Sequence, residues 1–225
     1  MSYRVKLALF FACAIAAFFL FDTAYQGLQT LSRLDAVEAE RDKWQLPNEI
    51  IQALDLKPGD VAVDLGCGSG YFTLKLSAAV GPSGKVLAED IRRLPLMFLW
   101  IRTFQRGQHN VKIVLGEAGD PRLAAQGANA VLIANTYHEF TDSHSILSHL
   151  FNSLISGGRL VVVDREPLPA KTGLMGTAAE QHEVSVNEVE KELREGGFEI
   201  VGRQDRFIEG DPSHETWWLI AARKP

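Results

Sequence analysis

The chain has 225 residues, a formal net charge of -5, 46% hydrophobic residues and 23% charged residues. This length predicts one folded domain with an appendage, and this composition supplies enough apolar material for a core. The acidic balance argues against a basic surface for binding nucleic acid. The two cysteines, Cys13 and Cys67, lie in unrelated contexts and no HExxH pattern occurs, so neither a disulfide framework nor a metal site is expected.

The N-terminus carries an uncharged apolar run, LALFFACAIAAFFLF, at residues 7–21. The run is shorter than the roughly 20 residues of a typical membrane span, and it also has the size of a signal-peptide core. Because Asp22 follows at once and no small-residue cleavage site is evident, we interpret residues 1–24 as an uncleaved membrane anchor. A cleaved signal and a buried core helix are the alternatives.

Residues 25–44 are predicted to form a second helical segment. Leu28, Leu31, Leu34 and Val37 recur at helical spacing next to the charged run DAVEAERDK. Two interpretations remain open for this segment. It is either an amphipathic helix lying on a membrane surface or a solvated linker helix that packs on the domain with a few leucines.

Residues 45–225 alternate apolar strands with helices, separated by turns rich in Gly, Pro and Ser. Such alternation predicts a mainly parallel sheet covered by helices on both faces. A capping box at Ser185 and the pair Gly196-Gly197 delimit the last helix. The predicted helices are residues 47–54, from Ser69 as a cap to about 80, 94–105, 142–154 and from Ser185 to Gly196; the predicted strands are 61–65, 85–90, 111–115, 130–134, 159–163, 198–206 and 215–222.

The chemically informative residues follow the first two strands. The first strand runs into DLGCGSG, in which Gly66, Gly68 and Gly70 let the backbone turn sharply and approach a ligand. The following helix points free N–H groups at such a ligand. The second strand ends at Glu89-Asp90, where a carboxylate can accept both hydroxyls of a ribose. The loop and the acid together indicate a cofactor that contains adenosine, with GxGxG spacing rather than the GxGxxG of dinucleotide binders.

The segment VAVDLGCGSGYFTLKLSAAVGPSGKVLAEDI resembles motif I and the acidic strand of class I S-adenosylmethionine-dependent methyltransferases. The resemblance continues through VKIVLGEAGDPRL, AVLIANTYHEF, SGGRLVVVD and ELREGGFEI, and it spans roughly residues 44–222. It implies a Rossmann-like α/β fold, doubly wound, with seven strands of which the last is antiparallel. It also implies S-adenosyl-L-methionine as the cofactor.

Carried over residue by residue, the resemblance implies a cofactor site. Asp64 with Gly66, Gly68 and Gly70 would hold the methionine and ribose part of the cofactor. Asp90 would hold the ribose hydroxyls, with Glu89 competing for that role. Glu117, or alternatively Asp120, would contact the adenine, and Asn135 would lie near the sulfonium. The sequence NTYH at 135–138 lacks the NPPY signature of enzymes that methylate amino groups of nucleic acids and glutamine.

Methyl transfer from a sulfonium mainly requires alignment of the acceptor and exclusion of water. His138, beyond the fourth strand, is the candidate base for an acceptor that must lose a proton, and Tyr137 could line the pocket. Either residue could equally serve structure, His138 by bonding a loop carbonyl and Tyr137 by packing in the core. His182 and Glu183 precede the last helix, in the region where this fold often builds an acceptor lid.

We therefore predict methyl transfer to a small, lipophilic acceptor at a membrane, with no nucleic-acid partner. The alternatives are a non-catalytic membrane-anchored scaffold or sensor that binds S-adenosylmethionine, and a nicotinamide-dependent oxidoreductase. The basic residues before the apolar run weakly favour an exported domain. Because S-adenosylmethionine is a cytosolic metabolite, we nevertheless predict that the catalytic domain lies on the cytoplasmic side.

Overall fold

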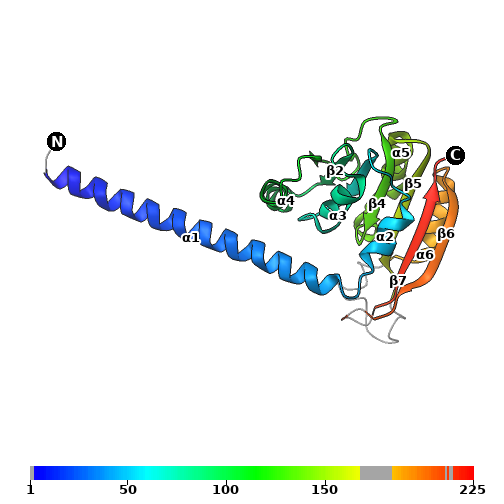
Figure 1. Cartoon of the computed structure of the whole chain (residues 1–225), viewed down its shortest axis with the longest axis horizontal. Coiled ribbons are helices and arrows are strands. Elements are labelled where there is room, and N and C mark those ends of the chain that lie inside the picture. Colours follow the sequence, from blue (N-terminus) through cyan, green and yellow to red (C-terminus); the bar gives the residue numbers. More distant parts are fainter. Residues whose placement is uncertain (1–2, 168–183, 211, 213–214) are drawn as a thin grey trace. The chain divides into compact units, whose positions relative to one another are not determined.

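The computed structural model describes residues 3–167, 184–210, 212 and 215–225. The chain divides into two units, Met1–Arg41 and Asp42–Pro225. The first unit is one continuous helix, α1 (Tyr3–Arg41), so the helix is unbroken between the two predicted N-terminal segments (Figure 1). In the part of the chain that the structure describes, no helix combines the length and the apolar character that crossing a membrane requires.

The second unit is built on a seven-stranded sheet with the order β3-β2-β1-β4-β5-β7-β6. The strands β1 to β5 pair in parallel, and β7 runs antiparallel to both of its neighbours. This topology confirms the predicted fold class. The strands are β1 (Val61–Leu65), β2 (Lys85–Asp90), β3 (Val111–Leu115), β4 (Ala128–Ala134), β5 (Leu154–Arg165), β6 (Glu199–Ile208) and β7 (Trp217–Arg223).

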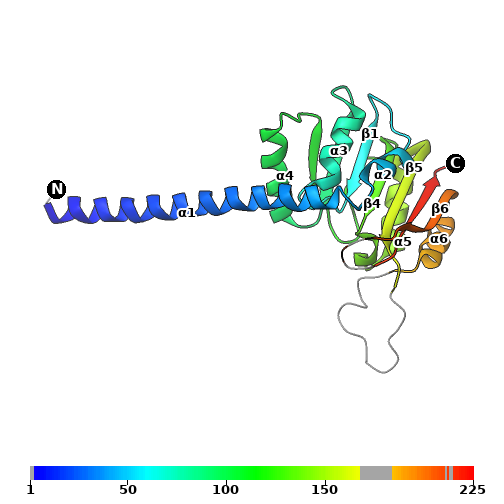
Figure 2. The same cartoon turned by 60° about the horizontal axis from the view of Figure 1, so that its bottom comes forward.

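Helices cover both faces of the sheet, as Figures 1 and 2 show. Apolar residues of α2 and α3 pack with those of one face, and α4 continues that layer over β2 and β3. Residues of α5 and α6 pack on the opposite face together with the short turn η1. The helices are α2 (Pro47–Ala53), α3 (Tyr71–Val80), α4 (Arg93–Gln105), α5 (Ser143–Ser153) and α6 (Val186–Glu195), and the 3-10 turn is η1 (Tyr137–Glu139).

The strands alternate their side chains between these two apolar layers. Trp217 belongs to the layer under α2 and α3, and Trp218 to the layer under α5 and α6. Both rings are buried. A sheet with two covered faces explains why the central strands read as continuous apolar runs instead of alternating with polar residues.

Several boundaries differ from the sequence-based prediction; β6 ends at Ile208 and β7 begins at Trp217, each two residues later than predicted. The helix α3 has Gly70 at its N-cap, in a left-handed conformation without a side-chain cap, so Ser69 is not the capping residue. The strands β4 and β5 begin at Ala128 and Leu154, ahead of their predicted starts. Their register shifts next to the start of β4, and Gly157 adopts a φ of +79°. The pair Gly157-Gly158, which lies inside the irregular strand β5, therefore looks like a turn in the sequence.

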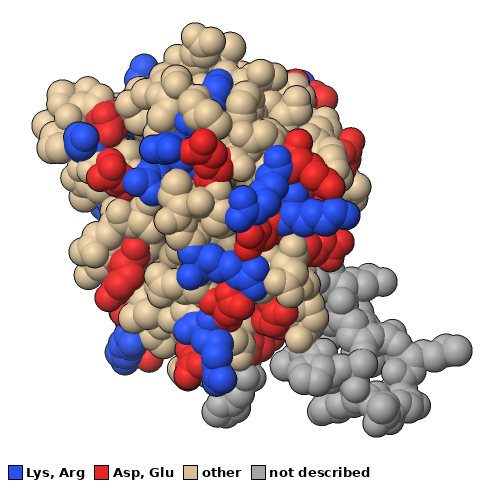
Figure 3. All heavy atoms as spheres, turned by 90° about the vertical axis from the view of Figure 1, so that its right-hand side faces the viewer, with Lys and Arg blue, Asp and Glu red and all other residues tan. Residues whose placement is uncertain are grey.

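The face on the β6 and α6 side carries basic and acidic side chains next to one another (Figure 3). Arg203 illustrates the pattern, since it contacts Glu190 at 2.6 Å and Asp205 at 2.5 Å. Arg194 also reaches Glu190, at 2.8 Å. Such exposed pairs are worth little individually, but they leave this face electrically balanced.

Candidate active site

A cavity of about 170 Å³, continuous with open solvent, lies beyond the carboxyl ends of β1, β2 and β4. This is the edge where open parallel sheets bind ligands. Its polar lining includes Glu89, Asp90 and Glu117, and its apolar lining includes Ile91, Phe140 and Ile146. The cavity therefore offers carboxylates on the β2 side and an apolar wall on the β4 side.

The glycine loop between β1 and α3 has the geometry that its sequence predicts. Gly66, Gly68 and Gly70 have φ values of +70°, +55° and +96°, a region that favours glycine. A Cβ at Gly66 would lie 2.2 Å from the Cγ2 atom of Thr136. Among the described residues, no atom lies within 4 Å of a Cβ built at Gly68. The middle of the loop thus faces open space that a ligand can fill.

Asp90 holds this loop in place. Its Oδ2 atom accepts a hydrogen bond from the backbone N–H of Gly68 at 2.9 Å, and its Oδ1 atom accepts from the backbone N–H of Arg92 at 2.8 Å. The Arg92 guanidinium lies 3.2 Å from the same carboxylate. Asp90 is nearly fully buried and also lines the cavity. Asp90, the predicted contact of the ribose hydroxyls, therefore contacts both the glycine loop and the cavity.

Glu89 lines the same cavity and is also buried. Its side chain crosses Gly116 so closely that a Cβ there would lie 1.8 Å from the Oε1 atom of Glu89. Burial raises the pKa of Glu89 to about 7; a hydrogen bond from the Gly66 backbone lowers it, and the charges of Asp90 and Asp64 raise it further. Glu89 is thus a carboxyl group whose charge changes near neutral pH. It lies beside Asp90, which is hydrogen-bonded to Gly68 and Arg92.

Glu89 gives the first testable prediction, a pH-dependent stability. The pKa of Glu89 in the folded protein lies above the ordinary value of 4.5. Its contribution to the stability of the folded state is therefore complete below about pH 4.5 and is lost as the pH rises through about 7. A shift of this size corresponds to on the order of 3 kcal/mol. We expect Glu89→Gln to abolish this part of the pH dependence and to raise the melting temperature at pH 8. The prediction would be contradicted if the melting temperatures of the two proteins changed in parallel between pH 5 and pH 8.

The two acids after β3 are separated by the structure. Glu117 lines the cavity, whereas Asp120 lies outside the lining and accepts a hydrogen bond from the backbone N–H of Arg122 at 2.7 Å. The guanidinium of Arg122 in turn contacts Glu117. Of the two candidates for the adenine contact, Glu117 is the one placed at the cavity.

The remaining cofactor candidates are Asp64 and Asn135. Asp64 is buried and accepts a hydrogen bond from the Thr73 hydroxyl at 2.5 Å, so it anchors α3 to β1. Asn135 adopts a φ of +57°, an unusual backbone conformation of the kind that clusters at functional sites. Its buried Oδ1 atom has no hydrogen-bond partner among the described residues. A buried amide oxygen without a partner is costly, and a bound group that donates a hydrogen bond would satisfy it.

His138 pairs with Asp164 across two neighbouring strand ends. The Nδ1 atom of His138 lies 2.8 Å from the Oδ1 atom of Asp164, and only 3% of the His138 side chain is exposed. The backbone N–H of His138 also donates to Asp164, at 3.3 Å. A carboxylate at Nδ1 fixes the tautomer that leaves the lone pair of a neutral ring on Nε2. Asp164 therefore fixes the orientation of the His138 ring, whose Nε2 atom lies 3.9 Å from the Oε1 atom of Glu139. His138 does not itself line the cavity, but its neighbours Thr136 and Glu139 do.

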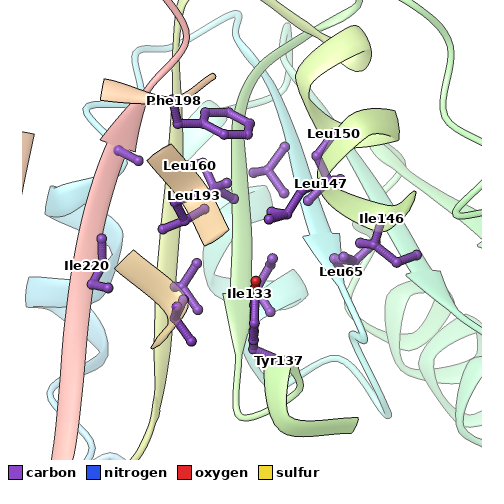
Figure 4. Close-up of a cluster of buried hydrophobic side chains, with 14 of the residues drawn as sticks. Leu65, Ile133, Tyr137, Ile146, Leu147, Leu150, Leu160, Leu193, Phe198 and Ile220 are labelled. Atoms are coloured by element: carbon purple, nitrogen blue, oxygen red, sulfur yellow. The ribbon is translucent and has the colours of Figure 1, made fainter. Parts of the chain in front are cut away.

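Tyr137 has a different environment. Its ring lies in the core beneath α5, next to Ile133 and Ile146 (Figure 4). Its hydroxyl donates to the Oε2 atom of Glu192 at 2.5 Å. Burial, and then Glu192, raise the pKa of Tyr137. This geometry favours the structural interpretation over the catalytic one, because the hydroxyl is directed at α6 and not at the cavity.

Asp164 and Thr136 are among the residues at the site that carry no role in the sequence-based prediction. Asp164 directly follows the predicted apolar strand 159–163, and the rule that ligands gather at carboxyl ends of strands could have singled it out. Thr136 has no such signal, because its importance lies in packing over Gly66. His182 and Glu183, the predicted lid residues, lie outside the described residues.

A family model described as a methyltransferase domain matches residues 56–219. The chain belongs to this methyltransferase family. The match covers the glycine loop, Asp90, Asn135 and the pair of His138 with Asp164. It confirms the predicted family and gives no support to the nicotinamide-dependent alternative.

Relatives and solved structures agree with this assignment. The chain is 26% identical to demethylmenaquinone methyltransferase of Geobacillus stearothermophilus over 59% of its length and 56% of the relative. It is 31% identical to 2-phytyl-1,4-naphtoquinone methyltransferase of Thermosynechococcus vestitus over 49% of its length and 48% of the relative. The chain thus spans about half the length of the curated relatives it matches. A structure of a SAM dependent methyltransferase from Aquifex aeolicus matches with a TM-score of 0.70 at 20% identity, covering 85% of this chain and 97% of that one.

Proposed function

We propose that the methyltransferase domain transfers a methyl group from S-adenosylmethionine to a small lipophilic acceptor of the quinol type. The observation that carries the proposal is the cavity itself, whose lining joins the start of the glycine loop and the buried Asp90 to an apolar wall, next to the turn that contains His138. The names of two relatives, which act on naphthoquinones, support the acceptor class.

The residues present fit the cofactor. Gly68 leaves open space beside Asp90, and the Asn135 amide oxygen lacks a partner in the described structure. We assign the ribose hydroxyls to Asp90, the adenine to Glu117, and the groups near the sulfonium to Asn135. When bound, S-adenosylmethionine supplies an already activated methyl group, so the protein needs chiefly to align the acceptor and exclude water.

In this proposal His138 takes the proton that a quinol hydroxyl must lose. The Nε2 atom accepts it, and the buried Asp164 carboxylate stabilises the imidazolium that results. The apolar side chains of Phe140 and Ile146 would hold a ring or isoprenoid acceptor against the cavity wall. The deprotonated acceptor can then take the methyl group on its oxygen, or on a ring carbon that afterwards loses its hydrogen to restore the aromatic ring.

Replacing His138 tests the proposed base. We expect His138→Asn to lower the turnover number by about 100-fold while S-adenosylmethionine affinity stays within about twofold by calorimetric titration. Asp164→Asn keeps the size of its side chain but loses the negative charge, so it should lower turnover and shift the pH profile of the reaction. Full activity in both variants would assign the pair to structure alone.

The acceptor class is tested directly. The full chain would be incubated with methyl-labelled S-adenosylmethionine and either a demethylated naphthoquinol, its oxidised quinone, or a water-soluble catechol. We expect label in the naphthoquinol and little in the quinone, which has no hydroxyl proton to lose and whose ring is electron-poor. Cofactor binding without transfer to any acceptor in a lipid extract would favour the non-catalytic scaffold instead.

We further propose that α1 attaches the protein to a membrane, with the methyltransferase domain on the cytoplasmic side where S-adenosylmethionine is made. Several large apolar side chains of α1 are exposed, among them Phe10, Phe18 and Phe21. Contiguous exposed apolar surface commonly marks an interaction site. Protease digestion of sealed cell-derived vesicles should cleave the domain only in inside-out preparations, and cleavage in right-side-out vesicles would overturn this orientation.

A further inference from the structure

The helix α4 is apolar on both of its sides. Its inner side buries Leu96 and Leu99 against Cys67 and Ala88, as a helix on a sheet should. Its outer side carries large apolar side chains where polar residues are the rule. Leu94, Met97, Trp100 and Phe104 are exposed by 62%, 48%, 61% and 74%.

These outer residues form one continuous stripe. Leu94, Met97, Trp100 and Phe104 follow one another at steps of three, three and four residues, which places them on one side of the helix. The rings of Trp100 and Phe104 stack with their centroids 6.3 Å apart. Exposed apolar residues scattered singly need no explanation, but a contiguous stripe marks an interaction surface.

The charge around the stripe has one sign. Between Asp90 and Glu117 the sequence has no acidic residue, although the whole chain has a net charge of -5. Arg93, Arg106 and Lys112 in this segment are exposed. On the face of β6 and α6 (Figure 3), basic and acidic side chains are intermixed, as in the contacts of Arg203 with Glu190 and of Arg223 with Glu199. The segment between Asp90 and Glu117 is thus a basic stretch of an acidic chain, and it contains the exposed apolar helix.

We propose that the outer side of α4 docks on an anionic lipid surface. A helix lying in the membrane interface combines exposed large apolar residues with Lys and Arg, and it prefers Trp at the boundary between headgroups and acyl chains. A second copy of the chain would bring two basic segments together without acids to pair them, so charge favours lipid over self-association.

Docking through α4 would have a consequence for the cavity. Ile91 is 53% exposed, lines the cavity and lies two residues before the start of α4. Contact of α4 with a bilayer would therefore hold one rim of the cavity at the lipid surface, where a lipophilic acceptor is concentrated. The proposal itself concerns binding only, and its failure would leave the proposed methyl transfer untouched.

Trp100 provides a natural probe for the test. Trp217 and Trp218 are buried, whereas Trp100 is the most exposed tryptophan among the described residues. The full chain would be mixed with vesicles of phosphatidylglycerol and phosphatidylcholine, or of phosphatidylcholine alone, with and without bromine on the acyl chains. We expect a blue shift of the emission and quenching by the brominated anionic vesicles, and we expect Trp100→Phe to remove most of both signals.

Two further variants separate the contributions to docking. Arg93→Glu combined with Arg106→Glu should reduce the quenching several-fold at low salt, and added salt should do the same to the wild type. Val201→Gln, which changes an exposed apolar residue on β6, is the matched control and should leave the signal unchanged. The double variant would be checked by circular dichroism and by S-adenosylmethionine binding, so that misfolding is recognised.

Three results would overturn the proposal. The first is equal quenching of Trp100 by aqueous iodide with and without anionic vesicles. The second is a Trp100 that is already shielded in buffer and becomes exposed on dilution, which would indicate a second copy on α4. The third is shielding that is independent of concentration and of vesicles, which would indicate that α1 of the same chain covers the stripe.

Discussion

Replacing Asp90 with alanine is expected to weaken S-adenosylmethionine binding at least about tenfold, because charge-assisted hydrogen bonds are lost from a buried site. The Asp90 carboxylate accepts from Gly68 at 2.9 Å and from Arg92 at 2.8 Å. Its removal therefore releases the glycine loop and also deletes the proposed ribose contact. Calorimetric titration with S-adenosylmethionine measures the effect.

Glu89 provides the comparison for this experiment. Glu89→Gln keeps an acceptor for the Gly66 N–H and leaves Asp90 in place, so it should change affinity at pH 8 much less than Asp90→Ala. If Glu89→Gln produced the larger loss, the ribose contact would belong to Glu89. Equal affinity in all three proteins would place the cofactor elsewhere.

A second large effect is expected from alanine at Gly66. The φ of +70° disfavours any side chain, and the new Cβ would lie 2.2 Å from the Cγ2 atom of Thr136. We expect Gly66→Ala to lower the free energy of unfolding by about 3 kcal/mol or more, from backbone strain and overpacking combined. Denaturant unfolding measures this change.

Gly68→Ala is the matched control for the loop. Its φ of +55° is also positive, but among the described residues no atom lies within 4 Å of the added Cβ. It should cost only about 1 kcal/mol of stability while lowering cofactor affinity, since the methyl group would occupy the space assigned to the ligand. Adding Thr136→Gly to Gly66→Ala should restore part of the lost stability. No restoration would show that the cost is strain and not the clash.

Most of the fold could be predicted because its signals are local. The strand β1 and the loop after it are specified by an apolar run followed by alternate glycines, and the predicted bounds of β1, β2 and β3 agree with the structure. Parallel pairing then follows from the alternation of strands and helices. The antiparallel β7 followed only from the family resemblance.

Residues of the site could be predicted where they follow a single strand, but their contacts with residues of other strands could not. Glu89 and Asp90 are adjacent in sequence, and only the structure shows that Asp90 fastens the loop while Glu89 acquires a raised pKa. The pairing of His138 with Asp164 joins residues that neighbouring parallel strands bring together from distant parts of the sequence. Its partner atoms depend on three-dimensional register, which no local pattern encodes.

The strand order β3-β2-β1-β4-β5-β7-β6 separates two sets of proposed site residues at the boundary between β1 and β4. Most of the proposed donor contacts, namely the glycine loop, Asp90 and Glu117, lie on the β1 side of that boundary, whereas His138 and Asp164 lie on the β4 side. Asn135 is the one proposed donor contact on the β4 side. The loops after β4 and β5 can therefore change during evolution while the loops after β1, β2 and β3 stay constant. Directed evolution toward a new acceptor should accordingly concentrate its randomised positions after β4 and β5.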